Sequence, residues 1–113
     1  MMLFNREKNE LTEVKVNGIP IGLSTETRFL DKSLDLVSGD RLVLYTDGVP
    51  DIFNPDGELF GKVRLMDMIK LTQNLPADEA LLQILDELQK WSEKDSSESY
   101  DDDITLIMID VSA

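Results

Sequence analysis

Two groups of aspartates border apolar runs, and they are the side chains best suited to chemistry in this chain. Asp47 follows the run Leu42 to Tyr45 and precedes Gly48. A second group, Asp101 to Asp103, leads directly into the apolar residues 104 to 109. The first run predicts a buried strand that delivers Asp47 to the rim of a sheet. Gly48 behind it lets a ligand or a second loop come close.

Each group also has an ordinary structural explanation. Asp followed by Gly is a favoured turn pair, and an acidic run is usually a solvated loop. Two carboxylates held about 4 Å apart repel by roughly 4 kcal/mol at an effective dielectric of about 20, and a divalent cation between them reverses the sign. Strand-end aspartates that meet at one rim would therefore favour a cation site built from oxygen ligands, which suit Mg²⁺ or Mn²⁺.

The composition excludes several other functions. A length of 113 residues predicts one domain, and 42% hydrophobic with 30% charged residues is typical of a folded protein. The net charge of −12 argues against nucleic acid or an anionic membrane as partner. The absence of cysteine and histidine excludes thiolate and imidazole metal sites and a Ser-His-Asp triad. No membrane span or signal peptide is expected, so the cytoplasm is the predicted compartment.

The first half of the chain predicts short strands. Residues 1 to 13 open with apolar side chains and then turn charged, a pattern that fits no more than a frayed strand. Alternation over Glu13 to Val16, followed by Asn17-Gly18, predicts a short strand and a tight turn. Arg28 to Leu36 predicts a strand with one exposed face. Ser38 to Asp40 would turn it into a second strand, Leu42 to Thr46, as an antiparallel hairpin.

The second half predicts a turn, two helices and a final strand. Asn54 to Gly57 has tight-turn composition and lies near the rim. Helical spacing of apolar residues predicts helices over Lys62 to Thr72 and over 77 to 92, the second beginning after Pro76. Residues 104 to 111 predict a strongly apolar strand. Core packing, and no cofactor, is the interpretation of three further residues: Met66, Met68 and Trp91.

Four motifs together resemble a known enzyme family. They are GIPIGL at 18–23, LVSGDRLVLYTDGV at 36–49, NPDGELFG at 54–61 and DDITLI at 102–107. In order and spacing the set resembles the PPM family of metal-dependent protein serine/threonine phosphatases. Within that family it is similar to the bacterial branch typified by sporulation stage II protein E and by stress-response phosphatases that regulate sigma factors.

The resemblance implies a hydrolase in which two Mn²⁺ or Mg²⁺ ions activate water to attack phosphoserine or phosphothreonine. By the matching motifs, Asp47 and Asp102 correspond to metal ligands, and no catalytic residue beyond the metal ligands is implied. Asp103 is implied to lie outside the ligand set, hydrogen-bonded to the loop, and Gly48 to let that loop pass close. The implied substrate is a phosphorylated regulatory protein such as an anti-sigma-factor antagonist.

The chain departs from the family pattern in length. The early aspartate-glycine motif that supplies further ligand acids is missing, as is the basic residue found near the phosphate in many members. Residues 1–113 are therefore interpreted as a single partial domain, the C-terminal portion of a phosphatase domain. The predicted fold is α+β, an antiparallel sheet covered by two helices, part of an α-β-β-α sandwich.

The missing portion leaves one sheet face without cover. We expect that face to associate with a second copy or with an N-terminal half, and we expect the isolated chain to be inactive. Two alternatives to the phosphatase remain at this stage. One is a non-catalytic interaction module, suggested by the incomplete ligand set and the charge of −12, and the other is a simple cation-binding domain that uses Asp47 and Asp102.

Overall fold

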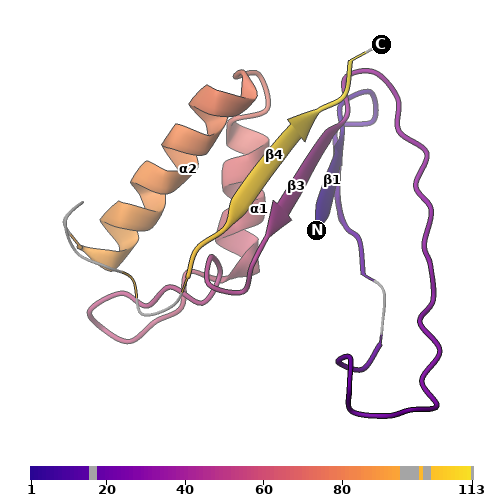
Figure 1. The fold of residues 1–113 in the computed structure, drawn as a ribbon. Helices are drawn as coiled ribbons and strands as arrows, with labels where there is room; N and C mark the ends of the chain where they lie inside the picture. The colour runs from indigo at the N-terminus through magenta and orange to yellow at the C-terminus, as the bar shows by residue number, and fades with distance from the viewer. Residues whose placement is uncertain (16–17, 95–99, 101–102, 113) are drawn as a thin grey trace.

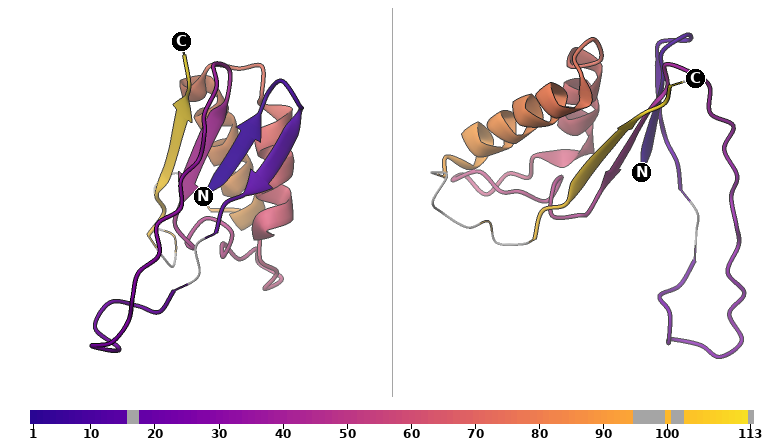
Figure 2. Two further views of the ribbon diagram at one scale, coloured as in Figure 1. Left: turned by 90° about the vertical axis from the view of Figure 1, so that its right-hand side faces the viewer. Right: turned by 45° about the horizontal axis from the view of Figure 1, so that its top comes forward.

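The described residues form one four-stranded antiparallel sheet with two helices packed on one of its faces (Figures 1 and 2). This computed structural model describes residues 1–15, 18–94, 100 and 103–112. In chain order the elements are β1 (Met2–Asn5), β2 (Glu10–Glu13), β3 (Arg41–Tyr45), α1 (Gly61–Leu71), α2 (Ala77–Ser92) and β4 (Leu106–Asp110). The order across the sheet is β2-β1-β3-β4, so β3 lies between the N-terminal hairpin and the last strand. The predicted α+β class is confirmed.

The N-terminal hairpin corrects two expectations. β1 and β2 are regular paired strands, with Met2 opposite Glu13 and Asn5 opposite Glu10, rather than a frayed segment. The amide of Lys8 donates to the Asn5 side chain at 2.8 Å, and Asn9 takes a positive φ of 53° that closes the turn. β2 ends at Glu13, so the strand predicted over Glu13 to Val16 is wrong in its bounds; residues 16 and 17 lie outside the described part.

The predicted hairpin between Arg28–Leu36 and β3 does not form. β3 is already paired on both edges, with β1 through Met2 opposite Val43 and with β4 through Val43 opposite Met108. Since no edge of β3 is left, residues 28–36 contain no strand and belong to an arm over residues 18–37 that extends away from the sheet (Figure 1). The turn at Ser38 to Asp40 does form, and Gly39 supplies its positive φ of 95°.

Both helices form where apolar spacing predicted them. α1 buries Leu65 and Ile69, and α2 buries one side chain per turn on the same face, at Ala80, Ile84 and Leu88. Pro76 stands immediately before α2, and its first turn carries two acids that suit the positive end of the helix dipole.

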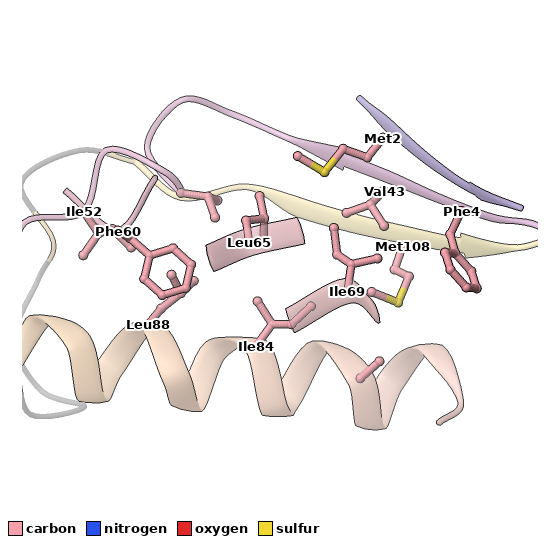
Figure 3. Close-up of a cluster of buried hydrophobic side chains, with 12 residues drawn as sticks. Met2, Phe4, Val43, Ile52, Phe60, Leu65, Ile69, Ile84, Leu88 and Met108 are labelled. Atoms are coloured by element: carbon pink, nitrogen blue, oxygen red, sulfur yellow. The ribbon is translucent and has the colours of Figure 1, made fainter. Parts of the chain in front are cut away.

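The core lies between the helices and the inner face of the sheet (Figure 3). Inward side chains alternate along the strands, so that Met2, Phe4, Val43 and Met108 meet the buried faces of α1 and α2. The residues predicted to serve core packing, Met66, Met68 and Trp91, all pack against this cluster.

A buried arginine ties the sheet to the turn between the helices. Arg41 has a relative exposure of 1%, and its guanidinium contacts Asp110 on β4 at 2.5 and 2.9 Å. The same group donates to the carbonyls of Thr72 at 3.1 Å and Leu75 at 2.6 Å. These contacts hold the α1–α2 turn against the rim of the sheet that lies opposite Asp47.

The outer face of the sheet is apolar. Leu3 stands opposite Leu42, Leu42 opposite Ile109, and Leu44 opposite Ile107, which gives a row of aliphatic side chains across three strands. Ile107 and Ile109 are 48% and 45% exposed. The arm adds further exposed apolar groups, among them Ile21 at 89% and Leu30 at 73%. None of the described helices covers this face.

Candidate metal centre

Pairing of β3 with β4 brings Asp47 and Asp103 to one rim of the sheet. The last pair of the ladder is Tyr45 with Leu106, so the chain leaving β3 and the chain entering β4 run side by side. The register continues one step further, because the amide of Thr46 donates to the carbonyl of Thr105 at 3.1 Å. Asp47 therefore emerges beside the segment over residues 103–105.

Thr46 clamps the two segments together through its side chain. Its hydroxyl accepts the amide hydrogen of Thr105 at 3.1 Å and donates to the carbonyl of Asp103 at 3.4 Å. Sequence reasoning did not single out Thr46. Its position in the sequence could have indicated this role, because Thr46 is the first residue after β3 and faces the residues just before β4.

Gly48 is the point of closest approach between the two segments. It is buried, and a Cβ built on it would overlap the carbonyl oxygen of Asp103 and lie 3.0 Å from the carbonyl carbon. That carbonyl belongs to backbone, so it cannot swing aside as a flexible side chain would. The close passage that the motif resemblance implied for Gly48 is thus a feature of the geometry.

The residues after Asp47 form a compact turn at the rim. The amide of Val49 donates to the carbonyl of Thr46, and that of Asp51 to the carbonyl of Asp47, each at 3.0 Å. The side chains of Asp47, Asp51 and Asp103 are exposed. Asp102, the second implied ligand, lies outside the described residues, as does Asp101.

Charged groups from β2 and α1 lie on the Asp47 side of the rim. Lys62, at the start of α1, pairs with Glu13 at 2.8 Å, and this hydrogen bond is the main cause that raises the pKa of Lys62. Burial raises the pKa of Tyr45, and the carboxylates of Glu13 and Asp47 act in the same direction. The charge of Asp47 is the smallest cause of the pKa shifts in Tyr45 and Lys62. Sequence analysis missed the Lys62–Glu13 pair, since only the sheet order brings β2 and α1 together.

A small pocket opens beside Gly48. Its volume is about 150 Å³. Its walls come from the loop after Asp47, the end of α2 and the segment before β4: Gly48, Asp51, Ile52, Phe53, Ser92, Lys94 and Tyr100. The predicted turn at Asn54–Gly57 lies further along the same loop and is confirmed, with the amide of Gly57 donating to the carbonyl of Asn54 at 3.0 Å.

The donor chemistry at the rim fits a hard divalent cation, and the number of donors is small. Carboxylate and carbonyl oxygens are the ligands that Mg²⁺ and Mn²⁺ prefer. Among the described residues, no group of three or more acidic side chains converges on one point. Asp47 would therefore form part of a cation site and not the whole of it.

The amino-acid sequence matches the family profile of Stage II sporulation protein E (SpoIIE) over residues 1–112. The chain belongs to the SpoIIE family. A curated relative, Protein IcfG of Synechocystis, is 35% identical over 96 residues, which is 85% of this chain and 14% of IcfG. The predicted family membership is confirmed.

The fold of this SpoIIE-family chain matches a solved PP2C domain. The SiaA-PP2C domain of Pseudomonas aeruginosa superposes with a TM-score of 0.77 at 23% identity, over 97% of this chain and 43% of that domain. The chain thus has the fold of part of a PP2C-type (PPM) domain. In its described residues no helix combines the length and apolar character that a membrane crossing needs.

Proposed function

We propose that this chain is the C-terminal portion of a metal-dependent protein serine/threonine phosphatase domain. The carrying observation is the junction of β3 and β4, where Gly48 packs on the backbone of Asp103 and Asp47 emerges at the same rim. Membership of the SpoIIE family and the PP2C-type fold support the assignment. The proposed substrate is phosphoserine or phosphothreonine on a bacterial regulatory protein, such as a phosphorylated anti-sigma-factor antagonist, in the cytoplasm.

Under this proposal each residue of the rim has a defined task. Asp47 and Asp102 supply carboxylate oxygens to the ion, and the clamp of Thr46 fixes the spacing between their two segments. Gly48 leaves room for the backbone of Asp103 to approach. Bound Mn²⁺ or Mg²⁺ supplies the Lewis acidity that activates water and neutralises phosphate oxygens. The remaining ligands of a two-ion centre would come from the portion of the domain outside this chain.

We further infer that the outer face of the sheet and the arm over residues 18–37 bind that other portion. The aliphatic row formed by Leu3, Leu42 and Ile109 needs cover in water. The matched SiaA-PP2C domain is more than twice as long as its matched segment, since this chain covers 43% of it. A second copy of the chain is the alternative cover, and it would give a homo-oligomer without a complete centre.

A chimera tests the proposed activity. This chain would replace the segment of the SiaA-PP2C domain that it matches, and hydrolysis of a phosphoserine peptide would be followed with and without Mn²⁺. We expect Mn²⁺-dependent hydrolysis that Asp47→Asn abolishes. Asp56→Asn, in the exposed turn of the same loop, is the matched control and should keep the activity. A folded chimera whose activity is the same in both variants would overturn the assignment of Asp47.

A further inference from the structure

The indole of Trp91 links the end of α2 to the loop that follows Asp47. Its Nε1 donates to the carbonyl of Ile52 at 3.2 Å, across 39 positions of the sequence. The same carbonyl accepts the amide of Phe60 at 2.8 Å. Ile52 is therefore held from two directions, by the far end of its own loop and by the opposite helix.

The Trp91 ring is itself fixed by its neighbours. Phe60 meets it edge to face, with ring centroids 5.9 Å apart and an interplanar angle of 77°. The guanidinium carbon of Arg64 lies 4.1 Å from the Trp91 ring centroid. Arg64 also donates to the carbonyl of Phe60 at 2.9 Å, so the cation joins the start of α1 to the same cluster.

A short stretch of the loop connects Ile52, which these hydrogen bonds hold, to Asp47 at the rim. Four residues separate Ile52 from Asp47, and the amide of Asp51 donates to the carbonyl of Asp47 at 3.0 Å. The amide of Gly61 donates to the carbonyl of Pro50 at 2.8 Å, which closes the loop at its other end. Ile52 is buried, and its carbonyl accepts hydrogen bonds from Trp91 and Phe60, so it is held in place five positions after Asp47.

We propose that Trp91 is a positioning residue of the candidate centre: its indole N–H holds the loop over residues 47–60 in the geometry that presents Asp47. The ring packs on the core, yet the N–H makes a contact that packing does not require, which separates the two roles. Where it concerns metal binding, this inference rests on the proposed function. Where it concerns the loop, it stands on the contacts alone.

The test compares Trp91→Phe with Ile84→Val in the full chain. Phenylalanine keeps an aromatic ring for Phe60 and Arg64 and removes the N–H donor. Ile84→Val removes one buried methyl from the same helix, away from the loop, and so controls for general destabilisation. Hydrogen exchange resolved by peptide is measured first, without metal. We expect exchange at Val49, Asp51 and Phe60 to quicken about three- to tenfold in Trp91→Phe, the factor for losing one ordinary hydrogen bond.

The second measurement is Mn²⁺ binding by calorimetry, in the chimera with the SiaA-PP2C domain that supplies the ligands outside this chain. The dissociation constant is expected to rise about tenfold in Trp91→Phe, the low end for groups that orient a metal ligand from outside, and to stay unchanged in Ile84→Val. Equal exchange of the loop in wild type and Trp91→Phe would overturn the positioning role. If the chimera with Trp91 unchanged failed to bind Mn²⁺, the proposed metal centre would be overturned, and the exchange result would still decide the role of Trp91 in the loop.

Discussion

Gly48→Ala should disrupt the junction between β3 and β4 because no space exists for a methyl group. The added Cβ would overlap the carbonyl oxygen of Asp103, and the backbone there cannot move without disturbing Thr46 and Thr105. Gly48 has no positive φ, so alanine could otherwise adopt its conformation. Without the overlap, this change would even stabilise the fold by about 0.4–1 kcal/mol, through the lower entropy of the unfolded chain.

The cost follows from two contributions. Overpacking of a filled site costs about 1–3 kcal/mol. Separation of the segments also weakens the hydrogen bonds of the Thr46 hydroxyl, each worth about 1 kcal/mol. We therefore expect Gly48→Ala to lower the free energy of unfolding by about 2–4 kcal/mol, which corresponds to a fall in Tm of roughly 8–16 °C for a domain of this size.

Thermal unfolding followed by circular dichroism, without metal, measures this effect. Gly18→Ala is the matched control, since a Cβ at Gly18 meets no atom within 4 Å. That variant should change the free energy of unfolding by no more than about 0.5 kcal/mol. If Gly48→Ala melted within about 1 °C of Gly18→Ala, the two segments would not be in contact in solution, and the geometry assigned to the candidate centre would be wrong.

Three further outcomes are expected. Arg41→Met should lower the free energy of unfolding by about 2–4 kcal/mol in chemical denaturation, because two carbonyls lose a buried donor. The hydrogen bond from Arg41 holds the pKa of Asp110 below its usual value. This pair therefore stabilises the fold above about pH 4, and the stabilisation is lost as the pH falls further. In Arg41→Met, the free energy of unfolding should no longer show this contribution to its fall with decreasing pH. Ile109→Lys should reduce self-association in sedimentation if the outer face binds a second copy. A monomeric wild type would argue against that mode of cover. Mn²⁺ at about 100 times its dissociation constant should stabilise the wild type by roughly 2.7 kcal/mol, and Asp47→Asn should abolish the gain.

Elements defined by local pattern were predictable from the sequence. The helix expected over 77–92 coincides with α2, and that expected over Lys62–Thr72 differs from α1 by one residue at each end. In both, apolar side chains recur at helical spacing and a proline or glycine marks the start, so the signal lies within the segment. The apolar runs that became β3 and β4 were predictable for the same reason.

Strand partners were not predictable, because pairing is decided elsewhere in the chain. Arg28–Leu36 has the composition of a strand, yet both edges of β3 are taken by β1 and β4. Residues 1–13 carried a usable signal in the apolar start, the polar turn over Arg6–Asn9 and the alternation after it. The importance of this signal is evident only from the structure, in which Met2 and Phe4 are fully buried core residues.

In the candidate centre, too, features set by local sequence were predictable, and features set by long-range contacts were not. Asp47 was predictable as a rim residue because its strand ends there, and Gly48 because the motif places a glycine next to it. The Thr46 clamp, the Lys62–Glu13 pair and the indole bond to Ile52 each join segments more than 35 positions apart. Such contacts depend on the sheet order β2-β1-β3-β4, which no local pattern encodes.

The long-range contacts around Asp47 bear on how the rim would hold an ion. Among the described residues no three acidic side chains converge, so Asp47 must be presented by its surroundings at a fixed place for donors from outside this chain to complete a site. Backbone contacts on one side, at Gly48 and Thr46, and the indole on the other provide that constraint without a further charge. Rigid presentation by neutral groups leaves the carboxylate of Asp47 exposed for a cation. A lysine or arginine bonded to that carboxylate would compete with the ion, and the nearby Lys62 is instead paired with Glu13.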